Sequence, residues 1–437
     1  MQNSALTPAV AADPPTATDT ISTRKIIAAT TLGNGLEVFD FTVYSFFAAY
    51  IGSAFFPSHD PLTSLLLSVG TFGAGFFARP LGALLIGSYA DRVGRRAAMT
   101  LTIWLMTLGT AAIGLCPTYA RIGVAAPLVV LAGRLLQGFS AGGEIGASTT
   151  LLMESGEVRK RGYMVSWQTL SQGVCAMLGA LFGLTLSHVL TPDALVSWGW
   201  RLPFLIGLLI APVGYYIRRH LPEVCGVASG RDTAQPPLRE LASSHLAKLV
   251  ACVFLLMSST VTMYTAVYFM PSYLTRVMHL PATTAFLAAM IGAMVMVAMS
   301  LVSGVLADSL RQRRRFALIF TAISTCVALP AFWLITHLPT PAIVLSVSAL
   351  LTGLMVLGSS NLVLMMMEAF PQRVRASGFA TSYAFSVTLF GGTAPFVVTA
   401  LIAHAQAPFM AGVYVFVCNL VSLAAVYAYR EQWRANA

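Results

Sequence analysis

Two carboxylates stand three residues apart inside a long apolar segment of this 437-residue chain. A helix puts Glu37 and Asp40 on one face, with their side chains close together. Two carboxylates so close, and removed from water, do not both stay ionised. The pair therefore predicts a group that takes up and releases a proton, and we expect Asp40 to do so in preference to Glu37. The alternative is that both acids pair with arginines and only lock helices together.

Two arginines lie in equally apolar surroundings. Arg134 stands near the midpoint of the apolar segment 123–153, so an acid or an anionic ligand has to satisfy its charge. Its planar guanidinium matches a carboxylate through two parallel hydrogen bonds. Arg79 directly precedes Pro80, and ligand contact and structural pairing are equally good interpretations of it. Together these residue types indicate that a carboxylate binds beside a proton-accepting acid.

Five neutral polar side chains in apolar segments are weaker candidates for ligand binding. Each can hydrogen-bond a carboxylate ligand, and each can equally bridge two helices. They are Tyr44, Gln168, Gln172, Asn361 and Tyr383.

The composition indicates what kind of element positions these groups. Only 10% of the residues are charged and 57% are apolar, whereas soluble domains carry about 25% charged residues. The expected solvent is therefore a lipid bilayer. The net charge of +10 comes from short basic clusters and not from a continuous basic face, which argues against nucleic-acid binding. The cysteines and histidines show no metal-ligand spacing, so no metal or other cofactor is expected.

Helices of about 20 apolar residues cross a bilayer, and the apolar segments predict an all-α integral membrane protein with twelve transmembrane helices in two six-helix bundles. Residues 1–22 are expected to be a disordered tail, 23–219 the first bundle, 220–245 a cytoplasmic linker, 246–430 the second bundle and 431–437 a second tail. The expected spans are 26–56, 62–90, 97–116, 123–153, 163–190, 200–219, 246–275, 283–307, 316–337, 341–366, 376–404 and 408–429.

The basic residues predict the orientation of these helices. With the N-terminus inside, only Arg121, Arg201 and Arg276 face outward, while Arg79 and Arg134 lie within the membrane. All other lysines and arginines are then cytoplasmic, as the positive-inside rule requires. Both termini are therefore expected in the cytoplasm, with the chain in the cytoplasmic (inner) membrane and functional as a monomer.

Two charged loops recur at matching places in the two halves. The turn Gly87 to Arg96 has a degenerate copy at 304–315, and the loop 154–162 has a counterpart at 368–378. Agreement at two separate loops indicates an internal duplication of six helices. Duplicated bundles are how many transporters alternate access to a central site.

The first charged turn also predicts a gate on the cytoplasmic side. We expect Glu144 to reach the turn and to join Asp91 and its arginines. The alternative is that these arginines only fix the topology. The expected gate residues are Asp91, Arg92, Gly94, Arg95, Arg96, Glu144 and, in the second half, Asp308.

The turn matches in full the loop signature G-x-x-x-D-R-x-G-R-R, and the chain thereby resembles the major facilitator superfamily. Further motifs resemble its metabolite:proton symporter branch: Gly33-Asn34 with the span-one acids, 78–82, 133–144 and 199–204. Within that branch, Ser166-Trp167-Gln168 with Gln172, and Gly391-Gly392 with Pro395, are most similar to the citrate and tricarballylate symporters. The chain departs from the branch at Gly35 and Val38, where bulky aromatics usually stand.

This resemblance implies proton-coupled symport of a small carboxylate by alternating access, with the Arg134 position assigned to substrate binding and proton coupling. The alternatives are symport of a zwitterion such as betaine or proline, and a non-transporting nutrient sensor on the same fold. An enzyme is not expected. The pattern Gly138-x-Ser140-x-Gly142 matches a hydrolase nucleophile motif, but that chemistry needs a strand-to-helix turn, and here the serine lies within a predicted membrane helix.

Overall fold

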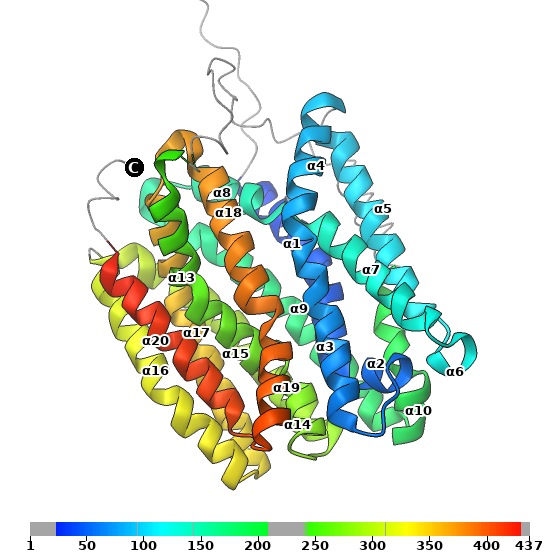
Figure 1. The fold of residues 1–437 in the computed structure, drawn as a ribbon. Coiled ribbons are helices and arrows are strands. Elements are labelled where there is room, and N and C mark those ends of the chain that lie inside the picture. Colours follow the sequence, from blue (N-terminus) through cyan, green and yellow to red (C-terminus); the bar gives the residue numbers. More distant parts are fainter. Residues whose placement is uncertain are drawn as a thin grey trace, which may run out of the picture.

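The computed structural model describes residues 23–93, 95–142, 144–208, 241, 243–310 and 312–429, and all regular elements in these ranges are helical (Figure 1). The side chains from 90 to 99 and from 143 to 147 lie outside the description. The two halves stand side by side, with the first half drawn in blue to green and the second in green to red.

The first half contains the helices that carry the predicted acids and arginines. Its elements are α1 (Thr23–Phe46), α2 (Ala48–Phe55), α3 (Pro61–Phe77), α4 (Arg79–Val93), α5 (Arg95–Gly114), α6 (Tyr119–Ile122), α7 (Ala125–Ala141), α8 (Glu144–Ser155), η1 (Val158–Lys160), α9 (Arg161–Val189), α10 (Pro192–Ser197) and η2 (Gly199–Arg201), followed by helical residues 202–208.

The second half repeats this order of long helices. Its elements are α13 (Leu246–Met263), η3 (Tyr264–Tyr268), α14 (Met270–Arg276), α15 (Ala282–Ser309), α16 (Arg313–His337), α17 (Pro341–Glu368), η4 (Gln372–Val374), α18 (Arg375–Ser386), η5 (Val387–Gly392), α19 (Ala394–Ala405) and α20 (Met410–Ala428).

The helices follow the predicted spans, and within the described ranges eight are long and apolar enough to cross a membrane, or nine if the bent pair formed by the first span counts as one. Four of the spans contain an irregular turn within the described residues. The first span bends at Phe47 and the second has a turn residue at Ala78, whereas the seventh and eleventh pass through π-helical turns, η3 and η5. Breaks of this kind leave backbone groups free of the regular helical pattern near the middle of a bundle.

We call the end of the molecule at which α9 and α13 begin, at Arg161 and Leu246, the linker end, and the other the opposite end. At the opposite end, short loops connect well-capped helices. Asp60 caps α3 by accepting hydrogen bonds from the backbone N–H groups of Leu62 and Thr63, at 3.1 and 3.0 Å. Thr340 caps α17 in the same way. Such caps satisfy backbone donors that the first turn of a helix leaves unpaired.

The two halves meet along α9 and α15, which pack against each other more extensively than any other described pair. Small residues allow this close approach. A Cβ on Gly162 would lie 2.6 Å from the carbonyl oxygen of Gly304, and one on Gly304 would lie 2.7 Å from the carbonyl oxygen of Gly162. The backbones of the two halves therefore touch at the linker end.

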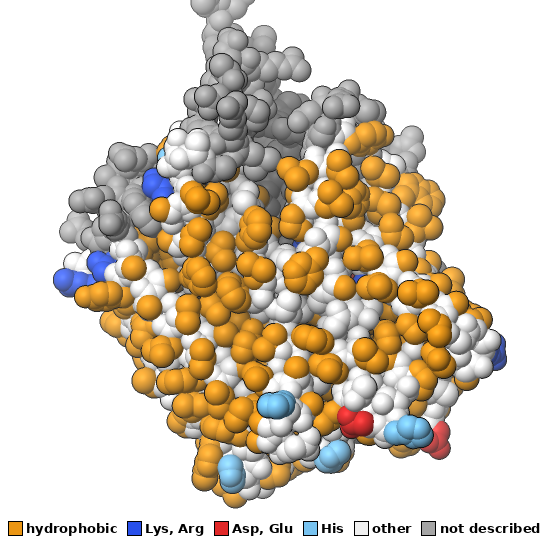
Figure 2. Space-filling model, viewed as in Figure 1, with side chains coloured by type: hydrophobic (Ala, Val, Ile, Leu, Met, Phe, Trp, Pro, Cys, Tyr) orange, Lys and Arg blue, Asp and Glu red, His pale blue; other side chains and the backbone are white. Residues whose placement is uncertain are grey.

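The outer surface of the bundle is apolar. Figure 2 shows hydrophobic side chains covering the visible face between the two ends, with charged side chains and histidines at its margins. Exposed residues such as Leu84, Trp104, Leu128 and Val305 belong to this surface. A face of this kind suits the hydrocarbon core of a bilayer.

Candidate functional site

A wholly buried arginine lies at the centre of the first half. Arg134, on α7, has 0% of its surface exposed. Its guanidinium carbon lies 4.4 Å from the ring centre of Phe41, 4.5 Å from Tyr44 and 4.9 Å from Phe72. These three rings, from α1 and α3, form an aromatic cage around the cation. Stacking of this kind is worth roughly 2 kcal/mol or more per contact when the pair is removed from water.

The guanidinium keeps free hydrogen-bond donors inside this cage. Its Nη1 donates to Oε1 of Gln137 at 2.7 Å. Its Nε and Nη2 have no hydrogen-bond partner among the described residues, although both atoms are buried. Unpaired buried donors are costly, so the site favours an anionic ligand that would accept from them.

Gln137 connects this arginine to the predicted proton-accepting acid. Its Nε2 donates to Thr110 Oγ1 at 3.0 Å and lies 3.5 Å from Oδ2 of Asp40. The Thr110 hydroxyl in turn donates to that carboxylate. Helix periodicity brings Arg134 and Gln137 onto one face of α7, and the close packing of α5 against α7 brings Thr110 to them. The result is a hydrogen-bonded chain from the cation to Asp40.

A second arginine shares one ring with the first. The guanidinium of Arg79 lies 4.6 Å from the centre of Phe41 and 4.3 Å from that of Phe76. Phe41 therefore contacts both cations. Arg79 is also buried, with 6% of its surface exposed, and it stands at the break between α3 and α4. The structure thus brings two of the predicted site arginines to one aromatic cluster.

Residues of the second half complete the cluster. Tyr264, in the π-helical turn η3, lies 5.6 Å from Phe76 and 6.3 Å from Phe72, measured between ring centres. Both Tyr264 and Tyr383 interact electrostatically with Glu37 and with Arg79. The charge of the buried Glu37 therefore acts on these two tyrosines of the second half, whereas Asp40 lies beside Thr110 and Gln137.

The five weaker candidates all have hydrogen-bond partners among the described residues. Tyr44 contacts Arg134 through its ring and donates its hydroxyl hydrogen to the Ser68 carbonyl at 3.2 Å. Gln172 hydrogen-bonds Tyr383 across the two halves, and Gln168 accepts a hydrogen bond from Thr149.

Asn361 does not join this cluster. Its amide donates to the backbone carbonyl of Arg313 at 2.9 Å, at the start of α16 and at the linker end. The sequence pattern could not distinguish this role from ligand binding, because a buried amide donates to a backbone carbonyl as readily as it donates to a bound ligand.

The expected linker-end gate is described in part. Gly94 and the side chains of Asp91, Arg92, Arg95, Arg96 and Glu144 lie outside the described residues. Asp308, on α15, accepts hydrogen bonds from the backbone N–H groups of Gly162 and Tyr163, at 2.6 and 2.8 Å. A carboxylate of the second half therefore holds the positive N-terminal end of α9 in the first half.

The opposite end carries its own contacts between the halves. Arg276, at the end of α14, donates through Nη2 to Ser53 Oγ at 2.9 Å and to the Ala49 carbonyl at 3.3 Å. Ser45 donates to the Tyr268 carbonyl at 3.1 Å. The buried charges thus lie between two sets of contacts that hold the halves together.

Comparison with known proteins identifies the family. The major facilitator superfamily matches residues 30–395. The chain is 35% identical to the citrate-proton symporter of Klebsiella pneumoniae over 407 residues, which cover 92% of this chain and 90% of the relative. The chain belongs to the major facilitator superfamily. It is a multi-pass membrane protein of a transporter family and not an enzyme. The pattern around Ser140 lies inside α7, where the hydroxyl donates to the Thr102 carbonyl at 2.7 Å.

A second kind of relative is equally similar. The chain is 34% identical to the glycine betaine/proline/ectoine/pipecolic acid transporter of Dickeya dadantii over 431 residues, 95% of this chain and 84% of that one. Among solved structures, the proton:xylose symporter shares the fold with a TM-score of 0.72 at 16% identity, over 95% of this chain and 96% of that one.

Sequence reasoning missed several residues of the cluster. Gln137 stands three residues after Arg134, and this spacing alone was a signal that both share a face. Thr110 and the rings of Phe41, Phe72 and Phe76 gave no signal, because aromatic residues in a membrane helix are common and the pairing of α5 with α7 is a property of the fold. Within the described residues, no group of His, Cys, Asp or Glu side chains is arranged to hold a metal ion.

Proposed function

We propose that this protein is a secondary active transporter that moves a small carboxylate together with protons across the cytoplasmic membrane. One observation carries the proposal. A buried arginine with free donors is joined through a single amide to a buried carboxylate. The names of the citrate symporter relatives support the same function.

The coupling would work through the Gln137 contact. A substrate carboxylate that accepts from Nε and Nη2 of Arg134 draws the guanidinium partly away from its rings and from Gln137. The Gln137 amide is then free to strengthen its hydrogen bond with Asp40. An ionised Asp40 accepts from the amide nitrogen, whereas a protonated Asp40 can donate to the amide oxygen. Anion binding and proton uptake thus act on one hydrogen-bonded chain. Glu37, which is also buried, is the second candidate for the proton.

Protons are needed for electrical reasons. Each elementary charge moved through 100 mV is worth roughly 2.3 kcal/mol, so a multivalent anion enters a negative interior only at considerable cost. Cotransported protons remove that cost. In this proposal the substrate contacts are Arg134, Arg79, Tyr44, Gln168, Gln172 and Tyr383. Asn361 is left out because of its place at the start of α16.

A second candidate substrate is a zwitterion such as betaine or proline, as the names of other relatives suggest. The aromatic cage favours it. If a carboxylate moved Arg134 or Arg79, the faces of Phe41, Phe72 and Phe76 would be exposed to an adjacent ammonium group, which such rings bind well. Two arginines, in contrast, favour a ligand with more than one carboxylate.

The test is uptake into proteoliposomes with an imposed pH gradient, acidic outside. Labelled citrate, tricarballylate, betaine and proline would be compared, with a protonophore as control. We expect protonophore-sensitive accumulation of a tricarboxylate. Accumulation of betaine or proline alone would select the second candidate, and accumulation that ignores the pH gradient would contradict proton coupling.

A further inference from the structure

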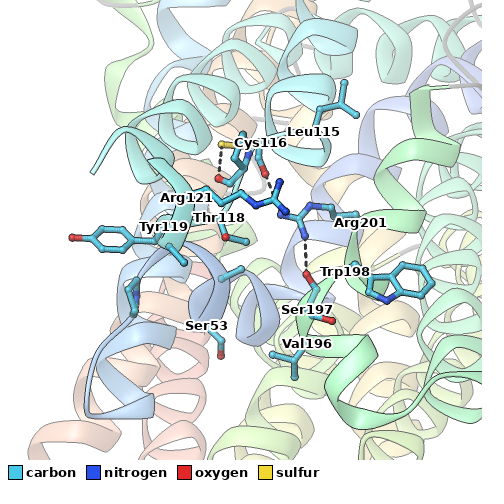
Figure 3. A pocket seen from close by; sticks show the side chains of 14 residues that line it. Ser53, Leu115, Cys116, Thr118, Tyr119, Arg121, Val196, Ser197, Trp198 and Arg201 are labelled. Atoms are coloured by element: carbon cyan, nitrogen blue, oxygen red, sulfur yellow. Dashed lines mark hydrogen bonds between the residues drawn. The ribbon is translucent and has the colours of Figure 1, made fainter. Parts of the chain in front are cut away.

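Three arginines that the predicted topology leaves facing outward gather around one pocket at the opposite end. Arg121 on α6 and Arg201 on η2 line it together with Ser53 at the end of α2 (Figure 3). Arg276 on α14 hydrogen-bonds the Ser53 hydroxyl from the other half of the molecule. These three arginines are distant in sequence, so the fold brings them together.

The pocket is large enough for a small organic molecule. Its volume is about 640 Å³, within the roughly 300–1,000 Å³ typical of small-molecule sites. It lies between the end of α2, the loop 115–121 and the segment 196–201, all in the first half. The described residues that line it include hydroxyl groups, such as those of Ser53 and Thr118, and no Asp or Glu.

The two lining arginines differ in their freedom. Arg201 is held in place, because Nη1 donates to the Ser197 carbonyl at 2.9 Å, Nη2 donates to the Cys116 carbonyl at 3.0 Å and the guanidinium stacks on Trp200. Arg121 is exposed. In Figure 3 its side chain reaches toward Arg201. One arginine is thus fixed and the other is able to adjust to a ligand.

The electrostatics of the pocket favour an anion. Arg121 and Arg201 both line the pocket and carry like charges that repel one another. Two cations that repel one another are relieved by an anion placed between them. The acids described at this end have other roles. Asp60 caps α3, and Asp193 lies in the first turn of α10, where a helix favours an acid.

We propose that this pocket binds a small carboxylate anion at the mouth of the transporter, apart from the central site. The preference for an anion rests on the geometry, and the choice of a carboxylate rests on the proposed function. A patch of like charge raises the local concentration of its counter-ion and speeds capture. Ser53 lines the pocket and also accepts a hydrogen bond from Arg276 of the other half. An anion in the pocket would therefore lie next to a contact between the halves that has to break when the opposite end opens.

Citrate binding to the full-length purified protein tests the proposal. Isothermal titration is done in the Arg134→Ala background, which removes the caged arginine of the central site and leaves the pocket intact. We expect one remaining citrate site, which Arg121→Gln weakens about tenfold and Arg121→Lys preserves. Arg159→Gln, which removes an exposed charge at the linker end, is the matched control and leaves binding unchanged.

Other results of the titration contradict the proposal. Citrate affinity that is the same with and without Arg121, or no citrate binding in the Arg134→Ala background, overturns it. An effect of Arg121→Gln on phosphatidylglycerol binding alone would assign the pocket to a lipid headgroup. If Arg134→Ala does not fold, citrate uptake is measured with Arg134 intact. Arg121→Gln alone then raises the KM for citrate several-fold at low salt and not at high salt. Titration in the Arg134→Ala background remains informative even if citrate is not transported.

Discussion

Arg134 illustrates how a membrane protein holds a buried cation: none of the ion pairs between described residues includes it. Three ring faces and one amide oxygen replace water around its guanidinium. This arrangement depends on shape, because only a flat cation can lie on several rings and still present its edge to a ligand.

At this residue we predict that Arg134→Lys fails nearly as badly as Arg134→Ala. An ammonium keeps the charge but cannot stack on the rings, hold Gln137 and grip a carboxylate with two parallel bonds at once. The apparent affinity for substrate should fall about tenfold or more, measured as KM for labelled uptake. Arg159→Lys at the linker end is the control. A near-normal KM would mean that Arg134 supplies only a point charge.

Asp40→Asn should separate binding from energy coupling. The amide keeps most of the shape beside Thr110 and Gln137 but cannot take up a proton. Downhill substrate exchange should therefore survive, whereas accumulation driven by a pH gradient should disappear. Glu37→Gln is measured in parallel. If Asp40→Asn still accumulates substrate in response to pH and Glu37→Gln does not, the proton belongs to Glu37.

At the scale of the element, the helix irregularities place the site. The π-helical turn η3 carries Tyr264 into the aromatic cluster, and the corresponding turn η5 packs against α3, where Thr388 donates to the Phe76 carbonyl at 3.1 Å. A single extra residue in a helical turn rotates the following side chains, and such turns recur at functional sites. They bring second-half residues to the aromatic cluster of the first half.

Hydrophobicity predicted the spans but not these turns, for a physical reason. The thickness of the bilayer sets the length of an apolar segment, so composition alone located the spans that the structure describes. Whether a segment stays regular depends on what packs against it, as with Gly391, where a Cβ would lie 2.7 Å from Thr260 and 2.9 Å from Tyr264. The same limit applies to side chains: the apolar segments single out Asp40 and Arg134, while Thr110, which donates to Asp40, comes from another helix.

The α9–α15 contact gives a prediction at this scale. Asp308→Asn keeps an acceptor for the α9 backbone but loses the negative charge that the helix N-terminus favours, an effect of about 1 kcal/mol. The linker end should therefore open about fivefold more often. Alkylation of a cysteine at Ser166, which packs against Gly304, would measure the opening. Glu157→Gln, at the same end but paired with Lys160 in its own half, should have no effect.

At the scale of the whole molecule, contacts at both ends enclose the buried charges. Asp308 joins the halves at the linker end, and Arg276 joins them at the opposite end. The alternating access that the proposed function implies requires that these two sets of contacts break in turn.

The predicted orientation is testable in intact cells. A cysteine introduced at Ala5 or Ala435 should resist an impermeant maleimide until the cells are opened, because the positive-inside rule puts both termini in the cytoplasm. Ser58→Cys, in the exposed loop before α3, should react at once. Labelling of the termini from outside would reverse the assignment of the two ends, and the pocket of Arg121 and Arg201 would then face the cytoplasm.

The amide of Gln137 has a consequence for leakage. Its oxygen accepts from the cation and its nitrogen donates toward Asp40, and an amide carries no proton that it exchanges readily at neutral pH. The Gln137 amide can therefore transmit a change in the orientation of Arg134 to Asp40, but it cannot carry a proton between Asp40 and the substrate. Without substrate, a proton on Asp40 therefore cannot be relayed through Gln137. We expect the substrate-free protein to show no uncoupled proton leak along this route.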